Sequence, residues 1–224
     1  MSVADNLAQV REQIAVAAAT AGRTNSEVTL VAVCKRQPIE RIFAAYDAGA
    51  RDFGESTVQG LCTTADALRG SGREVRWHFI GRLQRNKLNK LIPHRPLIHT
   101  VDGEGLAKSI GVRSSEPTEV LVQVNIGNEQ QKGGVASENA LLLARAVSKM
   151  PGLRLRGLMG MPPYSEDPRP YFEEMAKLSA QLRKLTGSED AAELSMGMTD
   201  DFTVAIQCGA TMVRVGTAIF GVRD

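Results

Sequence analysis

The chain has 224 residues, of which 43% are hydrophobic and 23% charged, so it is long enough to form one larger domain or two small ones around an ordinary core. Its 27 basic and 25 acidic residues nearly balance, and nothing in the net charge calls for a nucleic-acid or membrane partner. Three scattered cysteines without metal-ligand spacing argue against a disulfide framework, and no apolar stretch reaches the ~20 residues of a membrane span, so the cytoplasm is the expected location.

The first predicted element is an Ala-rich amphipathic helix over residues 3–21, whose central Arg11, Glu12 and Gln13 are unlike a signal peptide. Strands and helices then alternate to the end of the chain. The predicted strands cover residues 28–34, 51–56, 75–81, 96–102, 119–127, 153–160, 192–198 and 210–216. The helices predicted after the first seven cover about residues 39–49, 57–68, 83–92, 103–112, 137–150, 168–186 and 199–209. Ser137 is the expected N-cap of the helix that begins there.

Eight strands, each but the last followed by a helix, favour a single (β/α)8 barrel of the TIM type with an extra N-terminal helix. A doubly wound open sheet is the alternative, and the lack of a strong GxGxxG motif counts against it. No linker or repeat divides the sequence, so residues 1–224 are expected to form one domain.

The carboxyl ends of the strands form the active face of such a barrel. Lys35 stands at the end of the first strand, directly after the apolar run LVAVC (residues 30–34). A lysine amine whose pKa is lowered by its surroundings condenses with carbonyl groups, but a lysine at a strand end is also commonly an ordinary surface residue. The strand by itself leaves both interpretations open. The other strand-end candidates are Glu55, His78, Asn125, Met159, Ser195 and the RVGT stretch (residues 214–217).

Small residues follow the seventh and eighth strands, with Gly197 after one and Gly216 and Thr217 after the other. Backbone N–H groups at these positions and at the start of the short terminal helix suit an anion, and phosphate sites in barrels occupy this place. The alternative is that the glycines only turn the chain out of the barrel.

Arg214 is flanked by apolar residues in MVRVG, so it is expected to be buried and to need an acceptor. One candidate acceptor is a carboxylate such as Glu55. The other is the ring nitrogen of a heteroaromatic ligand, whose protonation a permanent cation would discourage.

A carbonyl-capturing lysine, a phosphate cradle and a cation for a ring nitrogen describe a site for pyridoxal 5′-phosphate. The sequence also resembles the YggS/PROSC family of pyridoxal-phosphate homeostasis proteins, which is related to the barrel domain of alanine racemase. The resemblance covers nearly the whole chain. Its most specific stretches are LSMGMTDDFTVAI (residues 194–206) and GATMVRVGTAIFG (residues 209–221).

This resemblance implies that Lys35 holds pyridoxal 5′-phosphate as a Schiff base. It places Ser195, Gly216 and Thr217 around the phosphate and Arg214 near the ring nitrogen. It implies a role in intracellular vitamin B6 homeostasis, with enzymes that lack their pyridoxal phosphate as candidate recipients.

One stretch departs from the family pattern, because the usual GENYVQE is GESTVQG here (residues 54–60). Ser56 and Thr57 replace the Asn-Tyr pair, and Gly60 replaces the second glutamate. We expect the affinity or exchange rate of the cofactor to differ as a result.

Two functions of different class remain after this comparison. A carrier that holds the cofactor without amino-acid turnover is favoured, and a small racemase-type enzyme is the alternative. Racemisation needs a second base, which related racemases take from a tyrosine of another domain; here Tyr164 is the only plausible substitute. Without that domain a monomer is expected. The basic run at residues 81–90 is expected to be a solvated helix face, with neither a nucleic-acid nor a membrane partner.

Overall fold

The computed structural model describes residues 1–129, 131, 133–164, 166–187 and 189–221. The strands that form its ring are β1 (Thr29–Val33), β2 (Asp52–Glu55), β3 (Arg76–Phe79), β4 (Leu97–Val101), β5 (Thr118–Asn125), β7 (Leu153–Gly160), β8 (Glu193–Ser195) and β9 (Met212–Val215). They are parallel and run in the order β4-β3-β2-β1-β9-β8-β7-β5, and an additional β4–β5 pairing closes the ring. The predicted eight-stranded barrel is therefore confirmed, since an open sheet would leave two edges unpaired.

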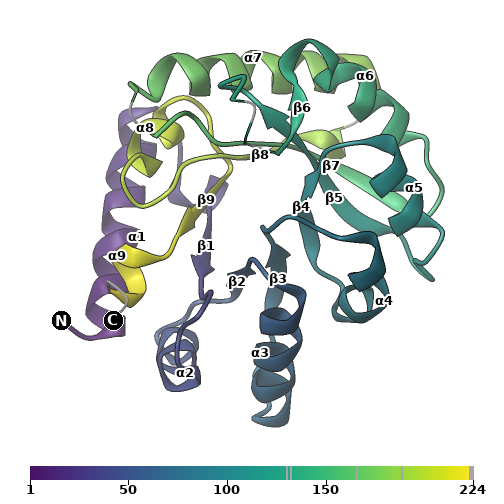
Figure 1. Ribbon diagram of the computed structural model, residues 1–224. Coiled ribbons are helices and arrows are strands. Elements are labelled where there is room, and N and C mark those ends of the chain that lie inside the picture. The colour runs from purple at the N-terminus through teal and green to yellow at the C-terminus, as the bar shows by residue number, and fades with distance from the viewer. Residues whose placement is uncertain (130, 132, 165, 188, 222–224) are drawn as a thin grey trace.

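Helices cover the outside of this ring (Figure 1). They are α1 (Val3–Thr20), α2 (Ile39–Asp47), α3 (Val58–Gly70), α4 (Leu88–Leu91), α5 (Glu104–Gly111), α6 (Ser137–Ser148), α7 (Arg169–Thr186), α8 (Phe202–Gln207) and α9 (Thr217–Phe220). A two-residue strand that the sequence did not predict, β6 (Val135–Ala136), pairs with the end of β5.

Besides shifts of one or two residues at several ends, three helices differ from the expectation. The N-cap of α6 is Ala136 rather than Ser137, because the backbone of Ala136 is still extended where β6 pairs with β5. The basic helix shrinks to α4, because 3₁₀ turns occupy residues 85–87 before it and residues 92–94 after it; the second turn contains Pro93, which lacks the N–H that a longer helix needs. The start of α8 moves to Phe202, because the Asp201 carboxylate accepts a hydrogen bond from the Met198 N–H (2.6 Å) and forms a turn first.

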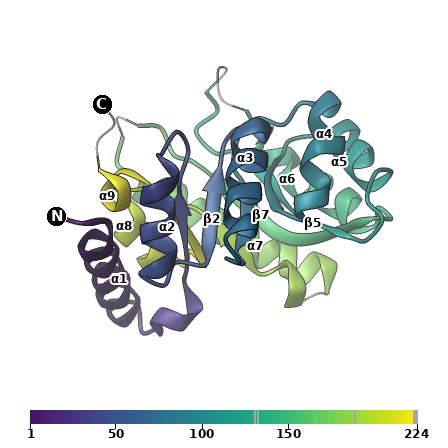
Figure 2. The same cartoon turned by 90° about the horizontal axis from the view of Figure 1, so that it is seen from below.

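The extra N-terminal helix α1 packs against the C-terminal part of the chain. It lies beside α8 and α9, as Figures 1 and 2 both show. The Asn6 amide donates to the Ile219 carbonyl (3.0 Å), and the Arg11 guanidinium donates to the carbonyls of Ala48 and Gly49 (2.9 and 2.7 Å). These bonds attach α1 to α9 and to the segment between α2 and β2.

The main hydrophobic core lies between the strands and the helices. Inside the ring a second, smaller apolar cluster contains Leu97, Leu121, Met159 and Met212. The barrel interior also holds buried polar side chains from several strands, which form the lower part of the site described below. Within the described ranges, no helix combines the length and the apolar character needed to cross a bilayer.

Candidate functional site

Lys35 lies two residues beyond β1, half-buried, at the carboxyl ends of the strands. The next residue, Arg36, has a φ of 59°, in the left-handed region that residues other than glycine rarely adopt. Such conformations persist where the surrounding structure enforces them, often at functional sites. The chain therefore turns sharply just after the lysine.

A buried carboxyl group accompanies Lys35. Glu55 ends β2, is 4% exposed and accepts a hydrogen bond from the Ser56 N–H (2.8 Å). Burial raises the pKa of Glu55; the backbone N–H groups of Ser56 and Thr57 and the positive charge of Lys35 only partly oppose it. The end of the first strand is thus polar on the side of β2.

Gly216 brings the end of β9 against the end of β1. The two strands pair in register, with Ala32 opposite Val215. A Cβ atom added to Gly216 would lie 3.2 Å from the Val33 carbonyl oxygen, so a larger residue would crowd the strand that carries Lys35. Thr217 is exposed and begins α9. Lys35, Gly216 and Thr217 therefore share one rim.

Gly197 has a different explanation. Its φ is 90°, and a Cβ atom there would lie 2.6 Å from Ala205 Cβ in α8. Its carbonyl accepts a hydrogen bond from the backbone N–H of Arg214 (3.0 Å). The glycine is required by the close packing of α8 on β8, whether or not an anion approaches it.

Arg214 is buried, as the sequence predicts, and is 4% exposed. Its Nη1 donates to Ser195 Oγ (2.6 Å) and its Nη2 to the Gly160 carbonyl (3.2 Å). Burial lowers its pKa to about 10, with the Asp201 carboxylate opposing the shift, so the guanidinium remains charged at neutral pH. Of the two candidate acceptors, Glu55 is thus not the partner of Arg214, because it lies on β2 beside Lys35.

Ser195 meets Arg214 inside the barrel. Its hydroxyl is fully buried and also bonds His99 Nδ1 (2.9 Å). The side chain is thus engaged below the rim by a cation and an imidazole, and its expected contact with a phosphate stays a prediction.

Sequence reasoning named His78 without choosing its role, and missed His99 and Asp52. His78 Nδ1 lies 2.9 Å from His99 Nε2, and His78 Nε2 lies 2.9 Å from Asp52 Oδ1. Burial lowers the pKa of both histidines, so both rings are neutral at neutral pH. The one available signal was that each histidine is preceded by three residues of a predicted strand and so points to the same side of its strand.

The other candidates at the strand ends have structural roles. Asn125 bonds the backbone of Glu129 and shapes the loop after β5. Met159 belongs to the apolar cluster inside the ring. Cys34 is buried in the main core, and burial raises the pKa of its thiol, as expected for a packing residue.

The residues that depart from the family pattern, Ser56, Thr57 and Gly60, lie close together at the start of α3. Thr57 caps α3, since its Oγ1 accepts a hydrogen bond from the Gly60 N–H (3.1 Å). A Cβ atom on Gly60 would lie 2.8 Å from that oxygen and 3.0 Å from the Glu55 carboxyl group. The Ser56 carbonyl lies against Gly81, where an added Cβ atom would approach it to 1.8 Å. A glutamate at position 60 would therefore disturb both the cap and the carboxyl group beside Lys35.

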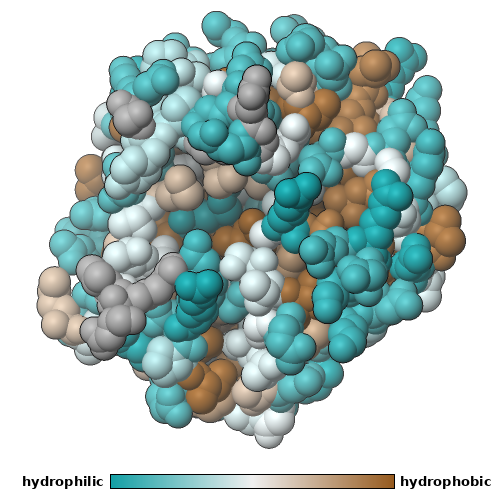
Figure 3. Space-filling view, viewed as in Figure 1, coloured by the Kyte–Doolittle hydropathy of each residue, from teal (hydrophilic) through white to brown (hydrophobic). Residues whose placement is uncertain are grey.

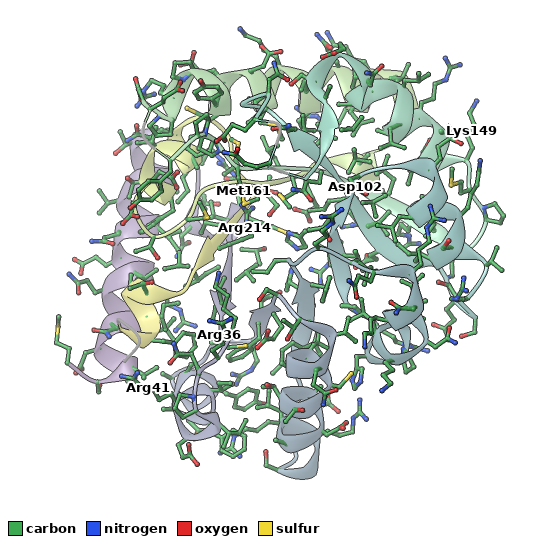
Figure 4. The ribbon with its side chains drawn as sticks, viewed as in Figure 1. Arg36, Arg41, Asp102, Lys149, Met161 and Arg214 are labelled. Carbon is green, nitrogen blue, oxygen red and sulfur yellow. The ribbon has the colours of Figure 1, made fainter. Side chains whose placement is uncertain are left out.

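The rim surrounds a hollow in the face seen in Figure 3, and Figure 4 places Met161 and Arg214 over its middle, with Arg41 and Lys149 at the edge of the view. A cavity of about 480 Å³ lies beside it, between the loop after β7 (Met161, Pro162) and the loop after β8 (Met198, Asp201). A larger cavity, of about 600 Å³, includes Pro96 and Thr118 at the opposite ends of the strands, away from Lys35.

Comparison with known proteins places this site in context. Residues 6–224 match the family model described as alanine racemase, N-terminal domain. The chain is 40% identical to the pyridoxal phosphate homeostasis protein of Pasteurella multocida, covering 100% of this chain and 99% of the relative. It is 43% identical to the protein of that name in Escherichia coli strain K12, covering 99% and 97%.

Among solved structures, PipY of Synechococcus elongatus with PLP bound is 29% identical and superimposes with a TM-score of 0.85, covering 98% of this chain and 100% of PipY. Alanine racemase of Corynebacterium glutamicum is 18% identical with a TM-score of 0.73, covering 100% of this chain and 64% of the racemase. The latter likeness concerns the fold alone.

Proposed function

Because the chain belongs to the family of pyridoxal phosphate homeostasis proteins, we propose that it binds pyridoxal 5′-phosphate as a Schiff base on Lys35 and serves the homeostasis of this cofactor. The pairing of β1 with β9 carries the proposal. It sets Val31 opposite Arg214 and brings the lysine and the guanidinium to one side of the barrel.

The residues present fit such a group. When bound, the cofactor supplies an aldehyde with which Lys35 Nζ condenses, releasing one water molecule. Gly216 leaves room beside β1 that a Cβ atom would fill, and Thr217 stands exposed next to it. We assign these two residues to the phosphate end of the ligand, as the family resemblance implies. The resemblance places Ser195 there as well, but its hydroxyl is engaged by Arg214 and His99.

Arg214 is assigned to the ring nitrogen. Its pKa of about 10 leaves it a cation and a hydrogen-bond donor at neutral pH, and its bonds to Ser195 and Gly160 hold it in place. A fixed positive charge disfavours protonation of a neighbouring pyridine nitrogen. The ring is then a weak electron sink, which suits storage better than turnover.

The test of the Schiff base is reductive trapping. Native protein incubated with pyridoxal 5′-phosphate and reduced with borohydride should carry one adduct, on Lys35, as located by peptide mass spectrometry. Lys35→Ala should carry none, and Lys149→Ala, which removes an exposed lysine at the edge of Figure 4, should match the native protein. An adduct on another lysine, or none in the native protein, refutes the assignment.

We propose further that the protein does not turn over amino acids. A racemase needs a base on each face of its substrate, and two of the three tyrosines are engaged elsewhere. Tyr46 lies under the Arg51 guanidinium (4.0 Å), the Tyr171 hydroxyl donates to Glu166, and Tyr164 is 90% exposed in the loop after β7. Exchange of the α-proton of amino acids in D₂O that disappears in Lys35→Ala would instead favour the racemase alternative.

The remaining proposals concern domain organisation, oligomeric state, cellular location and recipients of the cofactor. We propose one domain over residues 1–224, a monomer, a cytoplasmic location and cofactor-free enzymes as recipients. Large exposed apolar side chains in the described part of the chain lie singly on α1, α6, α7 and loops, and the three cysteines are free thiols. Light scattering tests the monomer, and recovery of activity by a cofactor-free transaminase mixed with loaded protein tests the transfer.

A further inference from the structure

A line of hydrogen bonds crosses the inside of the barrel. Arg214 bonds Ser195 (2.6 Å), Ser195 bonds His99 (2.9 Å), His99 bonds His78 (2.9 Å), and His78 bonds Asp52 (2.9 Å). The five side chains come from five strands: β9, β8, β4, β3 and β2. Ser195, His99 and His78 are fully buried, so water does not compete for these bonds.

The two ends of the line lie at opposite ends of the barrel. Arg214 is the third residue of β9 and faces the rim, whereas Asp52 is the first residue of β2. The Asp52 side chain is 24% exposed, so solvent reaches it from the face opposite Lys35. The line of hydrogen bonds thus connects the Asp52 carboxylate on that face to the Arg214 guanidinium below the site.

The protons along the line have one consistent arrangement. The Asp52 carboxylate only accepts, so His78 donates from Nε2 and, being neutral, accepts at Nδ1. His99 then donates from Nε2 and accepts at Nδ1, which requires the Ser195 hydroxyl to donate to it. The oxygen of Ser195 is left with its lone pairs for Arg214. Every bond points from the guanidinium toward the carboxylate.

We propose that Asp52, His78 and His99 are positioning residues for the cofactor: through Ser195 they hold the Arg214 guanidinium in the orientation in which it meets the ring nitrogen. This inference rests on the proposed function. If the line were interrupted, the Ser195 hydroxyl would be free to rotate its proton toward Arg214, and the guanidinium would lose a stable acceptor. Aligned bonds between opposite charges also strengthen one another.

The proton directions are testable without the cofactor. The chain has only three histidines, so ¹⁵N-labelled protein should give three pairs of ring signals, and a His94→Gln variant identifies the third. We expect His78 and His99 to be neutral and protonated at Nε2 in the native apoprotein. A proton at Nδ1 of either ring, or a positively charged ring at neutral pH, contradicts the arrangement.

The effect on the cofactor is tested at Asp52, which is remote from Lys35. Asp52→Leu removes the terminal acceptor, and Asp52→Asn keeps an acceptor oxygen. Asp47→Leu is the matched control, because Asp47 is a more exposed carboxylate that pairs only with Arg73 among the described side chains. The readouts are the visible absorption spectrum of the loaded protein and the rate of cofactor release.

Asp52→Leu should still be trapped on Lys35 but should show a shifted spectrum and about tenfold faster release, as expected for loss of a charged hydrogen bond. Asp52→Asn should change release less than about threefold, and Asp47→Leu should match the native protein. An unchanged spectrum and rate in Asp52→Leu overturn this inference and leave the proposed function standing. Failure of the native protein to be trapped overturns both. If Asp52→Leu does not fold, the histidine signals of the native protein still decide the arrangement.

Discussion

Glu55 lies beside Lys35 in the candidate site, and its buried carboxyl group also affects the stability of the fold. Burial raises its pKa, so the folded state favours the protonated carboxyl group. The stability that this group contributes is fully present below its ordinary pKa and is lost as the pH rises through the folded-state pKa. An uncharged residue of the same shape avoids that loss.

We therefore predict that Glu55→Gln gains stability relative to the native apoprotein between pH 4 and pH 7. Urea unfolding at the two pH values gives the comparison. Glu12→Gln, at an exposed position on α1, is the control and should show a constant difference. The same constant difference for Glu55→Gln would show that the carboxyl group is not held protonated.

Thr57 caps α3 through a hydrogen bond to Gly60, in the stretch where this chain departs from its family. Replacing a threonine N-cap by alanine typically costs about 1 kcal/mol, while serine keeps the bond. We predict that Thr57→Ala lowers the free energy of unfolding by about 1 kcal/mol and that Thr57→Ser changes it by a few tenths. Equal stability of the two variants in urea titrations would rule the cap out as a stabilising contact.

At the scale of elements, β7 contains an extra residue that shifts its register with β5. Val120 is paired with Leu155 but Leu121 with Gly157, so Arg156 has no partner residue on β5. Gly157 has a φ of 145°, and a Cβ atom on it would lie 1.9 Å from the Glu193 carbonyl of β8. The bulge therefore depends on glycine at this position.

We predict that Gly157→Ala destabilises the protein by more than about 2 kcal/mol, because strain and a backbone clash act together. Gly70→Ala is the control: nothing lies within 4 Å of the added carbon, and the residue ends α3. Alanine there should be neutral or slightly stabilising. Chemical denaturation measures both, and a small effect at Gly157 would mean that β7 and β8 can separate without cost.

At the scale of the whole molecule, the buried histidines make the fold sensitive to acid. Burial lowers the pKa of His78 and His99, and also that of the half-buried His94. As the pH falls, these rings therefore bind protons at a higher pH in the unfolded chain than in the folded chain. The stability they contribute is present above the ordinary histidine pKa and is lost as the pH falls below it.

Between about pH 6.5 and pH 5.5, we predict that the free energy of unfolding falls with decreasing pH, by up to about 1.4 kcal/mol per pH unit for each of the two buried rings. The carboxyl groups of Glu55 and Asp201 have raised pKa values and act in the opposite direction, so they reduce the observed slope. Urea titrations at closely spaced pH values measure the slope. A flat profile would mean that the rings take up protons without unfolding.

Most of the fold could be predicted from the sequence. Apolar runs bounded by glycine and proline place the eight strands, and 153–160 matches β7 at both ends. The expectations that failed are the Ser137 N-cap, the helix start at Thr199 and the length of the basic helix. The first depends on a contact with another segment, the pairing of β6 with β5, which capping preferences cannot include. The other two depend on local turns, at Met198–Asp201 and on both sides of α4, which form in place of a longer helix.

The candidate site divides in the same way. The positions of Lys35, Arg214, Gly216 and Thr217 were predictable, because each lies at or near the end of a strand and carries its own chemical signal. The line of hydrogen bonds that begins at Arg214 was not, since its other members, Ser195, His99, His78 and Asp52, come from four other strands. Their meeting depends on strand register around a closed ring, which no local pattern encodes.

By itself, then, the sequence determined the alternation of strands and helices and the position of Lys35 at the end of a strand, because periodicity and strand ends are properties of adjacent residues. Only the tertiary structure decided that β4 meets β5 and that a line of hydrogen bonds runs from Arg214 to Asp52. Both depend on how far each strand is displaced along its neighbour, and that displacement is settled when the whole ring closes and packs.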